Sequence, residues 1–325
     1  MPGRRTPGEG SVPRVSVVIP SRDRWPLLRV ALRSVFDQTL RDIEVIVVDD
    51  GSRDETPDAL ERIDDERLIV VTHATSSGVA RARNDGLTRA RTAWIAFLDD
   101  DDLWAPDKLE RQLAAVERRG AVLSSTCALR ITPAGTVVER VIAPGEDGIE
   151  RQLLSSNVIG GPSTVLARAD AVREAGGFDE RLSVLADWDL WLRLAARGPL
   201  VCLDEPLAAI LDHGANMQRV DIAHVQQELA YMRERHADRM RELRGDLRSA
   251  TLSAWMASIL LHEGHRRQAS LWYLDAARHS GAPSHVLRAA AALLGERHVA
   301  RVGSARRTQE LPATPPWVRA ALSAS

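Results

Sequence analysis

The chain has 325 residues, with 43 Lys and Arg against 45 Asp and Glu for a formal charge of −2, and 44% of its residues are hydrophobic. This length supports a large core and predicts two domains, or one large domain with an appendage. The near balance of charge argues against a general nucleic-acid binder, because such proteins carry a strong basic excess.

The first 120 residues alternate between apolar strands and amphipathic helices. We expect strands over residues 15–19, 43–48, 68–71 and 94–98, and helices over residues 26–36, 56–62, 78–89 and 106–118. This alternation predicts right-handed crossovers and a mainly parallel sheet flanked by helices. Loops at the carboxyl ends of such strands form a ligand crevice. Residues 1–13, rich in Gly, Pro and Arg, are predicted to be a disordered tail.

Aspartates follow three of the predicted strands. Asp23 follows the first strand, Asp49 and Asp50 follow the second, and a run from Asp99 to Asp102 follows the fourth. Adjacent carboxylates repel one another in a compact fold unless a cation offsets their charge or water solvates them. The sequence therefore predicts an acidic crevice that calls for a metal ion.

The run of four aspartates has two interpretations. In extended chain alternate side chains share a side, so Asp99 and Asp101 can converge on one ion while Asp100 points away. Oxygen ligands fit Mg²⁺ or Mn²⁺, held by one or two carboxylates plus substrate phosphates. The alternative is that Asp102 or a neighbour caps the helix that starts near Pro106, with the rest solvated.

Two familiar phosphate-binding motifs are absent from the sequence. Neither GxGxxG after the first strand nor GxxxxGK[ST] occurs. A bound nucleotide would therefore be read by carboxylates and held through a metal ion. Asp49 or Asp50 can accept hydrogen bonds from a base or a ribose, although the same stretch, with Gly51, also reads as a plain turn.

After about residue 120 the pattern changes. Residues 121–131 and 136–141 predict a hairpin-like pair, residues 149–155 a short helix, and residues 160–166 a glycine-rich turn into a strand. Asp187 lies at the start of an apolar helix, where a carboxylate by itself is more often a cap. Two further strands over residues 200–203 and 208–211 precede His213, in a place where a lone histidine is usually structural or solvated.

The last hundred residues are helical in character. Helices are expected over residues 222–243, 247–262, 266–280 and 283–294, arranged as hairpins, and residues 303–325 are predicted to be a loose tail. No run of about 18 apolar residues and no signal-peptide core occurs, which predicts a soluble protein with at most peripheral membrane contact. Cys127 and Cys202 lack a CxxC partner, which favours reduced thiols and a cytoplasmic setting.

Several motifs occur in an order that resembles family 2 glycosyltransferases of the GT-A fold. They are VSVVIPSRDR, SVFDQTL and EVIVVDDGSRDET within residues 15–56, GVARARNDG at 78–86 and WIAFLDDDDLWAPDKL at 94–109. The resemblance covers roughly residues 15–215. It implies an α/β, Rossmann-like GT-A domain over 14–217, with a nucleotide-binding half at 14–120 and an acceptor half at 121–217. A helical C-terminal region at 218–302 and the tail at 303–325 follow.

The same resemblance implies roles for individual residues. Asp187 corresponds to the catalytic base of the family. The remaining implied residues are Pro20, Ser21, Asp23, Asp50, Asn84 and Asp100 for the nucleotide, Asp99, Asp101 and His213 for the metal, and Gly161 and Trp188 for the acceptor. The sequence departs from the family at Arg22-Asp23, where Tyr-Asn is common, and at Ala186, where a Glu commonly precedes the base.

The implied activity is transfer of a sugar from a nucleoside diphosphate sugar to a hydroxyl acceptor, with inversion and with Mn²⁺ or Mg²⁺ as cofactor. The acceptor is a glycan, a lipid-linked sugar or a natural product, and the absence of a QxxRW-like segment favours single additions. Two alternatives stay open. Ala186 leaves room for a non-catalytic nucleotide- or sugar-binding scaffold. A nucleotidyltransferase also uses aspartates and Mg²⁺, but the first loop lacks the usual Gly-rich segment with Arg and Lys.

Overall fold

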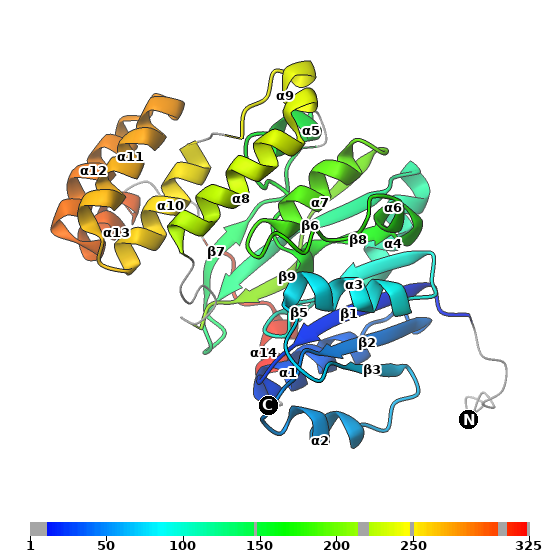
Figure 1. The fold of residues 1–325 in the computed structure, drawn as a ribbon. Helices are drawn as coiled ribbons and strands as arrows, with labels where there is room; N and C mark the ends of the chain where they lie inside the picture. Colours follow the sequence, from blue (N-terminus) through cyan, green and yellow to red (C-terminus); the bar gives the residue numbers. More distant parts are fainter. Residues whose placement is uncertain (1–11, 146–147, 214–220, 248–249, 305–310, 324–325) are drawn as a thin grey trace.

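The computed structural model describes residues 12–145, 148–213, 221–247, 250–304 and 311–323. Most of the predicted tail at 1–13 therefore lies outside the described residues. The described part forms a curled nine-stranded sheet with helices on both faces, and a helical region extends from one side of it (Figure 1).

The first half of the sheet is parallel, as the alternation of strands and helices predicts. Its strands are β1 (Val15–Ser21), β2 (Ile43–Asp49), β3 (Leu68–Thr72) and β4 (Trp94–Phe97), in the order β3-β2-β1-β4. Because β1 pairs with β2 on one side and β4 on the other, the strand order reverses at β1. A ligand crevice is expected at the carboxyl ends of strands flanking such a switch point.

The second half of the sheet is mixed. It contains β5 (Leu103–Trp104), β6 (Leu123–Ile131), β7 (Val137–Val141), β8 (Leu166–Arg168) and β9 (Leu200–Leu211). β8 runs antiparallel to both β4 and β6 and so joins the halves, while β6 and β9 are parallel. The two strands predicted over 200–211 are one strand. Polar Asp204 and Glu205 interrupt its apolar pattern, and its pairing with β6 shifts register beside Pro206.

Helices cover both faces of the sheet. The helices before residue 196 are α1 (Trp25–Phe36), α2 (Thr56–Glu61), α3 (Val79–Arg89), α4 (Lys108–Arg119), α5 (Ile149–Leu153), α6 (Ala169–Glu174) and α7 (Ala186–Ala195). On β1, Val17 packs with α1 and α4, while Val18 faces the cluster that includes residues of α3 and α7. The alternation of side chains along the strand thus creates two apolar cores, one on each face.

The C-terminal helices follow the predicted hairpin pattern, except that the helix expected over residues 222–243 is divided into two. They are α8 (Ile222–Arg235), α9 (Ala237–Leu243), α10 (Ala250–His262), α11 (Arg266–Ser280), α12 (Pro283–Leu294) and α13 (Glu296–Ser304). α8 packs on the α/β core through Val225, Leu229 and Met232, whereas α10 to α12 share a separate small core. Within the described ranges, no helix is long and apolar enough to cross a membrane.

The loose tail predicted at 303–325 is wrong for its last part. Residues Pro316–Ser323 form α14, which packs beside α1 (Figure 1). Val318 is fully buried against Leu129, Ile131 and Leu211. An eight-residue helix carries too few turns to display an apolar period, so the sequence pattern could not reveal it.

Gly86 is the close contact that lets α3 lie against β1. A Cβ atom at this position would be 2.3 Å from Cγ1 of Val18. We expect Gly86→Ala to lower the free energy of unfolding by about 1–2 kcal/mol, since overpacking outweighs the gain in helix propensity. Urea denaturation measures this change in the free energy of unfolding. Gly145→Ala, which meets open space, is the control and should change stability by less than about 0.5 kcal/mol; equal effects of the two would contradict the packing argument.

Candidate functional site

A cleft of about 650 Å³ opens at the carboxyl ends of β1, β2 and β4. Its charged lining consists of five aspartates and four arginines: Asp50, Asp99, Asp100, Asp101 and Asp102 with Arg22, Arg24, Arg83 and Arg130. Pro20 and Ser21, both predicted to contact a nucleotide, also line it. The predicted acidic crevice is therefore largely balanced by arginines, which sequence position alone did not reveal.

Asp50 is held by the loop before α3. Its carboxylate accepts hydrogen bonds from Ser76 Oγ at 2.6 Å, from the backbone N–H groups of Ser77 and Gly78 at 2.7 and 3.0 Å, and lies 2.7 Å from Nδ1 of His73. These bonds hold the pKa of Asp50 well below its usual range, even though burial opposes them. Asp50 is therefore a fixed anion at the cleft wall.

Asp100 contacts both the end of β1 and the loop that follows this strand. Ser21 Oγ donates to one carboxylate oxygen at 2.7 Å, and Arg24 Nη1 donates to the other at 3.2 Å. Burial raises the pKa of Asp100 to about 6, against the opposing effects of these two partners. Ser21 and Asp100, which the sequence assigns to one nucleotide site, are thus brought into direct contact.

Asp99 faces α3, where its partner is Arg83. Nη2 of Arg83 donates to Asp99 at 2.5 Å, and the guanidinium lies 5.2 Å from the ring centre of Phe178. Arg83 is 7% exposed. Its Nε–H is buried and has no hydrogen-bond partner among the described residues. Buried polar groups are nearly always hydrogen-bonded, so this unpaired donor sets Arg83 apart from the other arginines of the cleft.

Asp101 and His213 meet on the other side of the cleft. Nε2 of His213 is 3.0 Å from Oδ2 of Asp101, and Nη1 of Arg24 donates to the same oxygen at 2.9 Å. In the parts of the chain that are described, no three such side chains already converge on one point. Mg²⁺ and Mn²⁺ need only one or two carboxylates when phosphates and water complete the shell. Asp101 and His213 lie within reach of one such ion, whereas Asp99 is paired with Arg83 on the α3 side, and the ligand roles of all three stay a prediction.

Asp102 lies in a different environment from the three aspartates that precede it. It is 5% exposed, accepts a hydrogen bond from Ser163 Oγ at 2.5 Å, and receives the N–H of Leu211 in β9 at 3.3 Å. Burial, together with repulsion from Asp99 and Asp101, raises the pKa of Asp102 well above its usual range. Asp102 therefore ties β9 to the cleft, and the alternative in which it caps the following helix is wrong.

Asp187 begins α7 and does not line the cleft itself. Its carboxylate accepts two hydrogen bonds, one from the backbone N–H of Trp188 at 2.7 Å and one from Nδ2 of Asn157 at 3.1 Å. Burial raises the pKa of Asp187 to about 6, although the positive charge of Arg83 opposes this rise. Arg83 therefore acts on Asp187 while it binds Asp99, and it links the predicted base to the cleft electrostatically.

Trp188 does not fit the predicted acceptor role. Its side chain is 2% exposed within the core, and Nε1 donates to the carbonyl of Leu153 at 2.7 Å. One helical position after Asp187, the ring points inward rather than toward the surface. Gly161 is half-buried at the start of a 3₁₀ turn over Pro162–Thr164 and remains a candidate. The left-handed backbone of this turn falls on Gly160, with φ of +85°.

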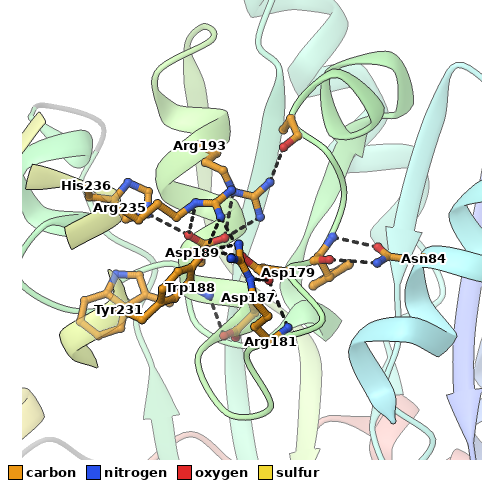
Figure 2. Close-up of polar contacts among 12 residues, drawn as sticks. Asn84, Asp179, Arg181, Asp187, Trp188, Asp189, Arg193, Tyr231, Arg235 and His236 are labelled. Carbon is orange, nitrogen blue, oxygen red and sulfur yellow. Dashed lines mark hydrogen bonds and ion pairs between the residues drawn. The ribbon is translucent and has the colours of Figure 1, made fainter. Parts of the chain in front are cut away.

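Asp23 and Asn84 lie beside the cleft without lining it. Asp23 accepts the N–H of Arg53 at 2.6 Å and so shapes the loop after β2. The amide of Asn84 donates to Phe178 O and Glu180 Oε1, both at 2.9 Å, and accepts the N–H of Phe178 at 2.8 Å (Figure 2). Both residues therefore organise the surroundings of the cleft, and a direct contact with a nucleotide stays a prediction for each.

Arg24 and Arg83 are among the cleft residues that sequence reasoning missed. Arginine is abundant in this chain, and arginines scattered among acids usually belong to solvated faces. For Arg83 a signal existed, because it shares the apolar face of α3 with Ala82, Gly86 and Leu87.

Known proteins with similar sequences identify the family. A family model described as Glycosyl transferase family 2 matches residues 16–174. The putative teichuronic acid biosynthesis glycosyltransferase TuaG of Bacillus subtilis (strain 168) is 35% identical over 190 residues, which cover 57% of this chain and 73% of TuaG. The chain belongs to glycosyltransferase family 2. The predicted family and enzyme class, a glycosyltransferase, are thus confirmed.

Further matches to this family 2 glycosyltransferase extend over more of the chain. A glycosyltransferase of Haemophilus influenzae, named only as uncharacterized, is 28% identical over 269 residues, or 80% of this chain and 89% of that protein. The crystal structure of S. aureus TarS 1–349 in complex with UDP-GlcNAc has a TM-score of 0.59 and 17% identity, and covers 91% of this chain and 92% of TarS 1–349. This likeness confirms the GT-A fold.

The amide of Asn84 is the main polar link between α3 and the loop before α7. We expect Asn84→Ala to lower the free energy of unfolding by about 1–3 kcal/mol, because it leaves the N–H and the carbonyl of Phe178 without partners. Thr88→Ala, on the same helix, removes only a hydroxyl that donates to the backbone carbonyl of Asn84; it is the matched control and should cost less than about 0.5 kcal/mol. Thermal or urea unfolding measures the loss of stability in each of the two variants. A fully stable Asn84→Ala variant with weakened nucleotide binding would instead place this amide at the ligand.

Proposed function

We propose that this glycosyltransferase moves a sugar from a nucleoside diphosphate sugar to a hydroxyl acceptor, with inversion at the anomeric carbon. The observation that carries the proposal is Arg83, a buried guanidinium that pairs with Asp99 at the cleft and acts on Asp187 beyond it. It connects a place for the diphosphate with a place for the base. That TarS was crystallised with UDP-GlcNAc supports a nucleotide-sugar donor.

The cleft is the proposed donor site. Ser21, Asp50 and Asp100 provide fixed polar groups for the nucleoside at the ends of β1, β2 and β4. Arg24 and Arg83 provide positive charge for the diphosphate, since the planar guanidinium suits phosphate oxygens. When a metal ion is bound by Asp99, Asp101 and His213, it supplies Lewis-acid stabilisation of the charge on the leaving diphosphate.

Proton removal is assigned to Asp187. The carboxylate takes the proton of the acceptor hydroxyl while the hydroxyl oxygen bonds to the anomeric carbon. The bond from that carbon to the diphosphate oxygen breaks at the same time, and its electron pair leaves with the diphosphate. A single displacement inverts the anomeric centre and needs no covalent sugar–enzyme intermediate.

The cellular setting is proposed to be cytoplasmic, with at most peripheral contact with a membrane. Two free cysteines, Cys127 and Cys202, support a reducing compartment. The hydroxyl acceptor is proposed to reach the cleft from the side of Gly161, which precedes the turn that packs against β4.

Metal-dependent nucleotide binding tests the donor site. We expect UDP, GDP or dTDP to bind with Mn²⁺ and at least tenfold more weakly without it, because an ion held by these carboxylates would supply positive charge for the phosphates. Asp101→Asn should remove the effect of Mn²⁺ as measured by calorimetry. Asp107→Asn, an exposed acid paired with Arg111, is the control and should bind like wild type. Binding that is equally tight with and without the ion would contradict the metal roles.

The rate of transfer should fall at acid pH. Because burial raises the pKa of Asp187 to about 6, this carboxyl is protonated below pH 6 and cannot act as a base. We expect kcat to fall about tenfold per pH unit below 6 and to level off above it.

Asp187→Asn should lower kcat about 10²–10⁴-fold, remove the acid limb and leave donor binding intact. Asp170→Asn, an exposed carboxylate on α6, is the matched control. Full turnover by Asp187→Asn would exclude it as the base. If the wild type binds donors yet turns none over, the chain is a nucleotide-binding scaffold instead.

A further inference from the structure

The first turn of α7 carries the proposed base but has no cap of its own. Its N-cap residue is Leu185, whose side chain makes no capping hydrogen bond. The first N–H groups of a helix lack partners within it and need outside acceptors. In the family resemblance a Glu precedes the catalytic aspartate, whereas this chain has Ala186. Within the turn, the Asp187 carboxylate itself accepts the N–H of Trp188, so further polar support has to act on the residues that lead into the helix.

That support comes from Glu228, in the middle of α8. Its carboxylate accepts the backbone N–H groups of Ser183 at 2.6 Å, Val184 at 3.1 Å and Leu185 at 2.9 Å. Glu228 is 3% exposed. A buried anion that accepts successive N–H groups just before a helix satisfies unpaired donors and complements the helix dipole. It also lies 2.9 Å from both the Ser183 hydroxyl and Nε2 of His224.

A second anchor from the end of α8 lies one helical turn further along α7. Asp189 is completely buried, and its carboxylate receives Nε2 of His236 at 2.8 Å, Nε of Arg235 at 3.3 Å and Nη2 of Arg193 at 2.6 Å (Figure 2). Arg235 also binds Asp179, in the loop before α7, at 2.7 Å. Two residues after the proposed base, α7 is thus bound to the C-terminal region by paired charges.

We propose that Glu228 is a positioning residue for Asp187, and that α8 thereby forms part of the catalytic unit. Glu228 touches neither the cleft nor Asp187. It acts through the backbone, because the residues that Glu228 anchors lead directly into the helical turn in which the N–H of Trp188 orients the Asp187 carboxylate. If this turn frays, the carboxylate loses its orientation while the donor cleft, built on β1, β2 and β4, keeps its shape. This inference rests on the proposed role of Asp187.

The kinetic signature separates positioning from general stability. We expect Glu228→Ala to lower kcat at least tenfold and to change the donor KM less than twofold. Glu228→Gln keeps one carbonyl oxygen as acceptor and the shape of the side chain, so it should restore a large part of kcat. The molar ratio of nucleotide binding, measured by calorimetry, gives the folded fraction, and kcat is expressed per binding-competent molecule. If Glu228→Ala fails to fold, the comparison is made with Glu228→Gln, whose kcat should lie at least threefold below wild type.

Asp275→Ala is the matched control. Asp275 is a carboxylate of the same helical region that accepts a hydrogen bond from Ser253 Oγ of α10 at 2.7 Å and lies 3.4 Å from Nε2 of His279 in α11. It should keep the wild-type kcat per binding-competent molecule even if its melting temperature falls.

Three results would overturn the proposal: unchanged kcat in both Glu228 variants, a loss that disappears after correction for the folded fraction, or an equal loss in Asp275→Ala. Failure of the base assignment looks different. If Asp187→Asn retains turnover, the catalytic role fails whatever Glu228 does, whereas an inactive Asp187→Asn beside a fully active Glu228→Ala removes only the positioning role.

Discussion

The cleft depends on ion pairs between arginines and a run of aspartates at the carboxyl end of β4. Arg24 binds Asp100 and Asp101, and Arg83 binds Asp99. Without these partners, adjacent carboxylates in a partly buried loop would repel one another or take up protons. The arginines thus let the protein fold with its acidic loop in place. In the proposed reaction the diphosphate attracts the same guanidinium groups and the carboxylates become available to an ion.

The parallel part of the sheet could be predicted because its signal is local. Uninterrupted apolar runs such as Val15–Ile19, each followed by a helix, permit few topologies. The place of the cleft followed from the same reasoning, since carboxyl ends of neighbouring strands meet at one edge. Asp99, Asp100 and Asp101 do line this cleft, with Ser21 and Asp50 beside them.

The remaining features depend on contacts that no local pattern encodes. Arg83 lies on the apolar face of α3, but only the packing of that face shows that its partners are Asp99 and Phe178. Trp188 adjoins the proposed base in sequence, but the phase of α7 turns the ring into the core. Asp102 is one of four identical neighbours, and only the distant Ser163 and Leu211 give it a separate, buried role. The acceptor for the N–H groups of residues 183–185, which lead into α7, is Glu228, more than forty residues later.

The C-terminal helices divide accordingly into two parts with different relations to the site. α8 shares the core of the α/β domain and holds α7 through Glu228, Arg235 and His236. α10 adds Leu252 and Met256 to that same core, and together with α11 and α12 it forms a second, smaller one. A boundary drawn at residue 218 from sequence therefore separates α8 from the helix that it supports, although the family model itself ends at residue 174.

The most direct test of this account is the affinity of wild type and Arg83→Gln for UDP and for uridine, measured by calorimetry with Mn²⁺ present. The account predicts at least a tenfold loss for UDP in the variant and little change for uridine, because the guanidinium serves the diphosphate and not the nucleoside. An equal loss for both ligands, or none for UDP, would contradict it. Arg83 would then only stabilise α3 and Asp99, and the link between the donor site and Asp187 would be lost.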